Sequence, residues 1–386
     1  MDEHEAGTEL GAELGGTELG DAFHQDLVGP LIRRELPRLR YAAARLGSGS
    51  DVLGLDYATS RDHDWGLRLT VLVDEADRGA VRPLTQLLDR GLPEQFRGRP
   101  VRFVTTWDAA VSHRVEVATV ADFAVSRLGV NPLGAGPPAD PAGLSSLDWL
   151  VLTGQSVLEV TAGPVYADST AELAILRRRL AWYPAGVERY VLACGWLRLC
   201  QRLPYVGRTG DRGQPLQSRL LSAGLVSDLV SLAFLLHRRW EPYEKWREAL
   251  FARLPSAAAL AGPLGTAIEA AGWPEREAAL AAAVEVLAAV QRRAGLPTPA
   301  AVVHGFFDRP YRMVAEALPQ LLLDGIGDPA LRQLVGMEAL GGSVGQWVDS
   351  ADVLAHPHRR AALAAAYRNW LDDVTGRDSP GPQSPG

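Results

Sequence analysis

Apolar positions early in the chain follow a helical spacing and then give way to short apolar runs. Between residues 22 and 40 they include Phe23, Leu27, Leu31 and Leu36, which predicts a helix. Four apolar runs bounded by turn residues predict strands, and a helix over Arg82–Arg90 separates the second from the third. The predicted strands are Tyr41–Leu46, Leu67–Val73, Val101–Thr105 and Arg114–Thr119. This order predicts a compact mixed α/β domain that ends near residue 130.

The pattern from Leu147 onward is helical almost to the end of the chain, with breaks at proline- and glycine-containing positions such as Gly207–Gly213. The stretch Asn131–Leu144, rich in proline and glycine, predicts a linker or long loop. A Gly/Glu/Leu repeat near the start and a Pro/Gly/Ser-rich end predict disordered tails. We therefore expect an α+β fold class with these segments: a disordered acidic tail (1–20), a small mixed-sheet domain (21–144), an all-helical bundle (145–374) and a second disordered tail (375–386).

Composition favours a cytoplasmic, soluble protein. The chain has 386 residues, enough for two domains, and a formal net charge of −7, which argues against coating nucleic acid by bulk electrostatics. Cys194 and Cys200 are separated by about 9 Å along one predicted helix, too far for a disulfide, so we expect reduced thiols. The acidic N-terminus does not resemble a signal peptide. The apolar run Ala223–Leu236 is too short and too close to charges to span a membrane.

The residues with the most specific chemistry lie between the first two predicted strands. Gly49 allows backbone N–H groups to approach phosphate oxygens, and Ser50 adds a hydroxyl donor. Asp62 and Asp64 are two residues apart at the start of the next predicted strand, so their side chains would leave the same face and bind hard cations together. An isolated Asp-x-Asp is usually a solvated turn. Its position between a strand-ending Gly-Ser and an apolar strand favours a site for magnesium and a nucleoside triphosphate.

A third carboxylate on a neighbouring strand would complete such a site. Glu116 stands between two valines in a predicted strand and so points away from one apolar layer, which makes it the first candidate. Asp108, near the end of the preceding strand, is the second candidate. An exposed strand residue is the alternative interpretation of Glu116.

Several motifs resemble a known family. Gly49-Ser50 followed by Asp62-x-Asp64, with Gly54 after the Gly-Ser, resembles the signature of the DNA-polymerase-β-like nucleotidyltransferase superfamily, which includes kanamycin- and lincosamide-type antibiotic nucleotidyltransferases. More narrowly, five motifs in this order, across roughly residues 25 to 320, resemble the family catalogued as DUF4037. They are Gly-Ser-x-Val-Leu-Gly-x-Asp, Ser-x-Asp-His-Asp-Trp-Gly, Arg-Val-Glu-Val, Val-Gly-Arg-x-Gly-Asp and Tyr-x-Lys-Trp. One departure from the superfamily pattern is His63, at a position that is usually apolar.

The resemblance implies roles for these residues. Gly49 and Ser50 would hold the β- and γ-phosphates, Asp62 and Asp64 would bind two magnesium ions, and Glu116 would be the third carboxylate and a possible base. The helical domain would add cations for the triphosphate: Lys245, the only lysine in the chain, is the first choice, with Arg219 and Arg208 behind it. A helix connection with surface Arg and Lys side chains is the alternative for each.

The sequence thus predicts an enzyme that transfers a nucleoside monophosphate from an NTP, with ATP the expected donor, to a hydroxyl group and releases pyrophosphate. The acidic net charge favours a small-molecule acceptor over a nucleic acid. Two alternatives stay open: transfer to a macromolecule, either a tRNA or a protein, and a nucleotide-binding regulatory protein without catalysis. The acceptor, the preferred NTP and the oligomeric state are left undefined by the sequence.

Overall fold

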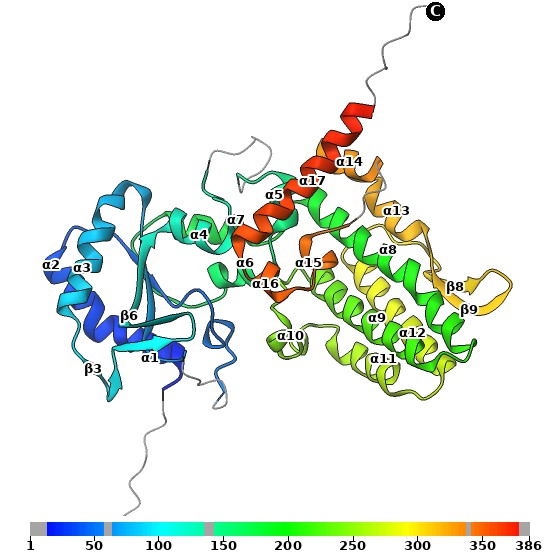
Figure 1. The fold of residues 1–386 in the computed structure, drawn as a ribbon, viewed down its shortest axis with the longest axis horizontal. Helices are drawn as coiled ribbons and strands as arrows, with labels where there is room; N and C mark the ends of the chain where they lie inside the picture. The colour runs from blue at the N-terminus through cyan, green and yellow to red at the C-terminus, as the bar shows by residue number, and fades with distance from the viewer. Residues whose placement is uncertain (1–13, 58–63, 135–142, 337–340, 378–386) are drawn as a thin grey trace, which may run out of the picture. The chain divides into compact units, whose positions relative to one another are not determined.

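The computed structural model describes residues 14–57, 64–134, 143–336 and 341–377. The chain divides into two compact units. Unit 1 consists of Met1–Ala124 and Leu158–Arg178, and unit 2 consists of Val125–Val157 and Arg179–Gly386. Figure 1 shows a strand-containing unit 1 and a mainly helical unit 2. The α+β fold class predicted from the sequence is confirmed.

Unit 1 is built on a five-stranded mixed sheet with the order β5-β6-β2-β1-β7. Its strands are β1 (Ala42–Ala44), β2 (Arg68–Val73), β5 (Arg102–Thr105), β6 (Asp108–Thr119) and β7 (Val165–Asp168). β2 and β6 run parallel, whereas β1 runs antiparallel to both β2 and β7, and β5 runs antiparallel to β6. A separate two-stranded hairpin consists of β3 (Gln95–Phe96) and β4 (Arg99–Pro100).

Helices cover one face of this sheet. Alternate residues of β2, Leu69, Val71 and Val73, join Val115 of β6 in a buried apolar cluster with side chains from the helices. Among the described residues of unit 1, the helical elements are α1 (Gly16–Phe23), a π-helical turn (His24–Val28), α2 (Gly29–Glu35), two 3₁₀ segments (Asp51–Leu53 and Glu75–Ala80) and α3 (Val81–Gly91). Three helices contain a point at which the chain passes from one unit to the other: α4 (Val120–Leu128) and α6 (Gly154–Thr161) near their middle, and α7 (Glu172–Arg179) at its last residue.

Unit 2 is organised around two long neighbouring helices, α8 (Ala185–Gly210) and α9 (Pro215–Leu236), which pack with α12 (Trp273–Arg293). The other helices are α5 (Ser146–Val151), α10 (Glu244–Phe251), α11 (Ala257–Glu269), α13 (Ala317–Leu323), α14 (Pro329–Gly336), α15 (Val344–Trp347), α16 (Ala351–Leu354) and α17 (Pro357–Arg377). A hairpin of β8 (Val303–Phe306) and β9 (Arg309–Val314) packs against α8 and α12.

Helix α9 has the length and apolar composition of a membrane-spanning helix. In unit 2, however, it packs against α8, α11 and α12. Its Asp228 carboxylate also pairs with Arg198 and Arg202 of α8. A core helix of a bundle passes the same composition test, so α9 by itself is only weak evidence for a membrane span.

The two cysteines are both free and buried, as predicted. Burial raises the pKa of the Cys194 thiol and that of the Cys200 thiol to about 12. Both thiols therefore stay protonated at neutral pH and behave as small apolar core groups.

Three features differ from the predictions. Residues 16–20, assigned to a disordered tail, begin α1, and Leu19 is buried in the core of unit 1. The predicted all-helical segment contains β7 and the β8-β9 hairpin. The predicted boundary at residue 144 separates β7 from the sheet to which it belongs, because β7 pairs with β1.

Candidate functional site

The Gly-Ser loop and the Asp64 turn lie at the same edge of the unit 1 sheet. β1 and β2 are antiparallel, with Ala44 opposite Thr70. The chain therefore leaves β1 toward Gly49 at the edge where it enters β2 from Asp64. A side-chain contact joins the two segments, since Arg68 Nη2 donates a hydrogen bond to Ser48 Oγ at 3.3 Å. The Gly-Ser loop and the first residue of β2 are thus in contact.

A buried ion pair shapes the Gly-Ser loop. Arg45 follows β1 directly and forms a two-point contact with Asp51, with Nε 2.7 Å from Oδ2 and Nη2 2.9 Å from Oδ1. Only 3% of the Arg45 side chain and 6% of the Asp51 side chain are exposed. The Ser50 residue beside Asp51 is also buried, whereas Gly49 is half-buried.

Only glycine fits at position 49. Its φ of +140° lies in the region that disfavours residues with a Cβ atom. A Cβ at this position would also lie 2.3 Å from Asp51 Oδ1 and 2.4 Å from Arg45 Nη2. Gly54, with φ +66°, then ends the 3₁₀ segment in the left-handed conformation.

Asp64 is held at the tip of the β5-β6 hairpin. The Thr106 N–H donates a hydrogen bond to Asp64 Oδ1 at 2.7 Å, and the Thr106 hydroxyl donates to Oδ2 at 2.5 Å. Asp64 lies in a turn and β2 begins only at Arg68, so the expectation that it starts the strand was wrong. The same-face argument from strand alternation therefore does not apply to it. Asp62 and His63 lie outside the described residues.

The two candidates for a third carboxylate occupy different positions on β6. Glu116 pairs in register with Thr70 and shares a face with Arg68, the residue that contacts the Gly-Ser loop. Asp108 begins β6, close in the chain to Thr106, but its Oδ2 is 2.7 Å from Arg114 Nη1 and its Oδ1 accepts from the Ala110 N–H at 2.9 Å. The hydrogen bond from Arg114 holds the pKa of Asp108 below its usual range.

The described carboxylates of unit 1 do not form a complete metal site. Within the described ranges no group of three His, Cys, Asp or Glu side chains lies close enough to hold a metal ion. Asp62 lies outside the described ranges, so this finding does not cover a metal site that includes Asp62. The carboxylate of Asp64 and the carboxylates on β6 are the hard oxygen donors that magnesium prefers.

The three cationic residues predicted for the triphosphate all lie in unit 2. Lys245 is exposed on α10, with its Nζ 4.9 Å from the ring centroid of Trp246. Arg219 is exposed on α9, and Arg208 packs its guanidinium over the rings of Tyr205 and Phe306. Arg208 was expected in a loop, but α8 continues through it to Gly210. Their assignment to a nucleotide stays a prediction.

Sequence reasoning missed Arg45, Asp51 and Thr106, which position the predicted groups. A charged residue directly after the apolar strand Ala42–Ala44 is a usable signal for Arg45, because a buried guanidinium needs a partner nearby in the fold. Asp51, six residues later, could be suggested by the same reasoning. Nothing local to Thr106 marks it as the partner of Asp64.

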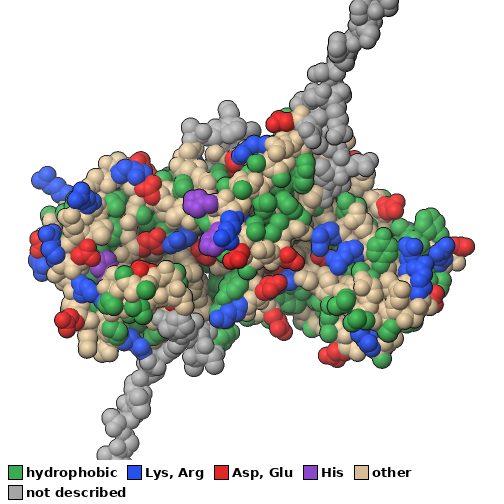
Figure 2. All heavy atoms as spheres, viewed as in Figure 1, with side chains coloured by type: hydrophobic (Ala, Val, Ile, Leu, Met, Phe, Trp, Pro, Cys, Tyr) green, Lys and Arg blue, Asp and Glu red, His purple; other side chains and the backbone are tan. Residues whose placement is uncertain are grey.

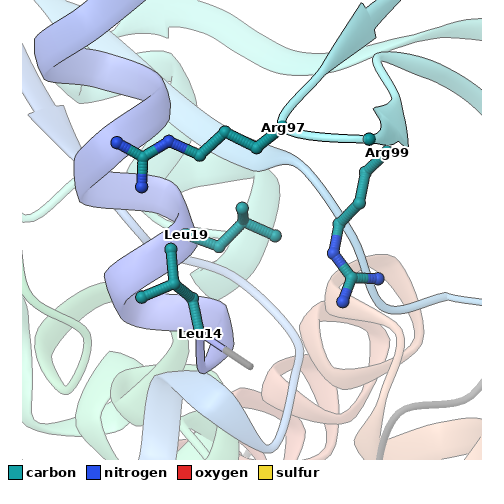
Figure 3. Close-up of a pocket in the computed structure, with 5 residues that line it drawn as sticks. Leu14, Leu19, Arg97 and Arg99 are labelled. Carbon is teal, nitrogen blue, oxygen red and sulfur yellow. The ribbon is translucent and has the colours of Figure 1, made fainter. Parts of the chain in front are cut away.

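A pocket of about 460 Å³ opens elsewhere in unit 1. It is lined by Leu14 and Leu19 of the N-terminal segment and by Arg97, Gly98 and Arg99 of the β3-β4 hairpin (Figure 3). The predicted site residues do not line it.

Comparison with known proteins gives one family. Residues 149–247 match the family model described as "Domain of unknown function (DUF4037)". No match was found among curated proteins. Among solved structures, a nucleotidyltransferase-like protein from Exiguobacterium sibiricum 255-15 is similar at 13% identity over 70% of this chain and 78% of that chain, with a TM-score of 0.32.

The matched segment contains Val-Gly-Arg-x-Gly-Asp and Tyr-x-Lys-Trp, the last two motifs on which the predicted resemblance rested. The Gly-Ser and Asp-x-Asp motifs precede it in the chain. The resemblance predicted from the sequence is confirmed over this segment, because residues 149–247 match the DUF4037 family model.

Proposed function

We propose that this protein is a magnesium-dependent nucleotidyltransferase. In this proposal it transfers a nucleoside monophosphate from an NTP, with ATP the expected donor, to a hydroxyl group of a small molecule and releases pyrophosphate. The observation that supports it most is the convergence of the Gly-Ser loop and the Asp64 turn at one edge of the sheet, joined by the Arg68 to Ser48 hydrogen bond.

The backbone of the Gly-Ser loop at Gly49 supports this proposal. Gly49 is half-buried and allows close approach, and within the described residues its N–H has no hydrogen-bond acceptor. The proposal assigns this amide and Ser50 to the β- and γ-phosphates. It assigns Asp62 and Asp64 to two magnesium ions, with Glu116 as the third carboxylate. Bound magnesium would supply charge neutralisation for the triphosphate and the leaving pyrophosphate.

A small-molecule acceptor is favoured by charge. The net charge is −7, and Figure 2 shows Lys and Arg side chains interspersed with Asp and Glu side chains on the face in view. Proteins that bind a nucleic acid usually present a continuous basic surface to its phosphates. Transfer to a protein side chain or a tRNA would be an alternative outcome of the experiment below, as would NTP binding without transfer.

The test uses the full chain with each of the four NTPs labelled on the α-phosphate, with magnesium and a metabolite extract. We expect label to move to a small product and pyrophosphate to appear in equal amount. Asp64→Ala should lower this turnover by about 100-fold or more, because the site would lose one of its hard ligands. Unchanged turnover in Asp64→Ala would contradict the metal assignment.

Asp26→Ala is the matched control. It also removes one carboxylate from unit 1, and Asp26 forms an exposed ion pair with Arg97. We expect it to keep full turnover, since exposed pairs of this kind contribute little. Label that appears on protein or tRNA would select the macromolecular alternative, and NTP binding without any labelled product would select the regulatory one.

A further inference from the structure

The Arg45 side chain holds the Gly-Ser loop from its buried side. Besides its two contacts with Asp51, the guanidinium donates from Nη1 to the Leu46 carbonyl at 2.5 Å and from Nη2 to the Ser48 carbonyl at 2.8 Å. Its backbone is also fixed, since the Arg45 N–H donates to the Pro164 carbonyl at 3.0 Å. The planar fork of one buried residue thus sets the direction of two carbonyl groups in the loop.

The direction of a carbonyl group fixes the direction of the next amide. In a planar trans peptide the C=O of one residue and the N–H of the next point in opposite directions. The Leu46 peptide illustrates this: its carbonyl accepts from Arg45, while the Gly47 N–H donates to the Glu159 carbonyl at 2.7 Å. The Ser48 carbonyl likewise points toward Arg45, so the Gly49 N–H points away from the buried side. Gly49 and the exposed Ser48 make this side of the peptide accessible.

Arg45 also cancels a negative charge beside the same amide. The 2.3 Å separation between Asp51 Oδ1 and the Cβ position of Gly49 shows that the carboxylate lies directly against the loop. An unpaired carboxylate there would repel a triphosphate. Paired with a buried guanidinium, it presents little net charge to the loop surface.

We propose that Arg45 is a positioning residue for triphosphate binding: it aims the Gly49 amide outward and neutralises Asp51. This inference rests on the proposed function and names the device that prepares its phosphate site. Asp51 is needed to keep Arg45 in place within the fold but is unfavourable for the polyanion.

The experiment measures binding of inorganic tripolyphosphate with magnesium to the full chain by calorimetry, together with the KM for the NTP. Arg45→Lys keeps the positive charge but loses the fork that reaches both carbonyls. We expect about tenfold weaker tripolyphosphate binding and a similar rise in KM, the size of effect given by loss of one well-aligned hydrogen bond to a charged group. Asp51→Asn keeps an acceptor for Arg45 and removes the carboxylate charge, so binding should be unchanged or tighter.

This split distinguishes positioning from mere structural support, because both variants disturb the two-point contact between Arg45 and Asp51, whereas only Arg45→Lys loses the fork that reaches both carbonyls. Equal loss of binding in both variants, or no loss in Arg45→Lys, would overturn the inference. If Arg45→Lys does not fold, Asp51→Asn decides: kept or tighter binding supports the inference and weaker binding overturns it. Arg102→Lys is the control, since Arg102 also donates to carbonyls, those of Asp89, Leu92 and Pro93. Wild-type protein that neither binds tripolyphosphate nor turns over an NTP would overturn the proposed function itself.

Discussion

The Glu277 carboxyl group is buried in unit 2 without full hydrogen bonding. Only 3% of the residue is exposed, and within the part of the chain that the structure describes its Oε1 has no hydrogen-bond partner. Gly207 of α8 lies directly against it, since a Cβ there would be 2.7 Å from Oε1. Burial raises the pKa of Glu277 to about 7, although the Arg312 backbone N–H and side-chain charge oppose this rise.

This pKa predicts how stability depends on pH. The folded-state pKa lies above the usual value of 4.5, so the protonated form is favoured by folding. Its stabilising contribution is fully present below about pH 4.5 and is lost as the pH rises to about 7, a total of about 3 kcal/mol. Glu277→Gln should remove this term and be more stable than wild type at pH 8. The free energy of unfolding from urea titrations at pH 5 and pH 8 measures it.

Glu275→Gln is the control for that measurement, because Glu275 is exposed on the same helix. Its stability should follow the wild-type pH dependence. A Glu277→Gln variant with the wild-type slope between pH 5 and pH 8 would contradict the raised pKa.

The third carboxylate can be assigned by paired substitutions on β6. Both oxygens of Asp108 are already engaged by Arg114 and the Ala110 N–H within the hairpin. Glu116 shares a sheet face with Arg68, which contacts the Gly-Ser loop. We therefore expect Glu116→Gln to lower kcat by about 100-fold or more, the usual effect of removing a general base. Asp108→Asn should leave kcat nearly unchanged, and the opposite ranking in steady-state turnover would assign the role to Asp108.

At the scale of elements, local apolar patterns were sufficient for four of the five strands of the unit 1 sheet, β1, β2, β5 and β6. The run Leu67–Val73 became β2 and Arg114–Thr119 became the end of β6, because both bury alternate side chains against helices. β7 was missed, since it has four residues, half of them exposed, and gains its stability from pairing with β1 far away in the chain. Such pairing leaves no local pattern.

Glycines misled the prediction in two places for the same physical reason. The Gly/Glu/Leu repeat was interpreted as a disordered tail, yet Gly16 and Gly20 let α1 pack closely onto Asp51 and Tyr166. In α8, Gly207 and Gly210 were interpreted as a loop, but their missing side chains make room for Glu277, Tyr311 and Trp273. Glycine that breaks an isolated helix is tolerated when a neighbouring side chain fills its space.

For the candidate site, the sequence could predict only those residues whose type alone suggests a chemical role. Gly49, Ser50 and Asp64 could be named as candidates because phosphate and metal binding favour those residue types. Arg45 and Thr106, which orient them, depend on contacts across the fold, such as the bond from Thr106 to a carboxylate 42 positions earlier. Such contacts cannot be derived from spacing in the sequence.

At the scale of the whole molecule, the division into units differs from the predicted one because a segment beyond the predicted boundary at residue 144 belongs to unit 1. Residues 158–178 follow the linker in sequence but belong to unit 1, where β7 pairs with β1. Leu176 of α7 lies in this segment and is fully buried. A boundary at residue 144 would make it part of the helical domain instead. Its substitution therefore tests which units unfold separately.

Leu176→Ala should destabilise unit 1 by about 2–5 kcal/mol, the usual cost of deleting a buried leucine side chain. Hydrogen exchange on the full chain should then speed up in β1 and β2 and stay unchanged in α8 and α9, because separate units open with separate free energies. Leu229→Ala, at an equally buried position on α9, should give the reverse. Faster exchange in α8 and α9 from Leu176→Ala, with β1 and β2 unaffected, would contradict the division and restore the boundary at residue 144.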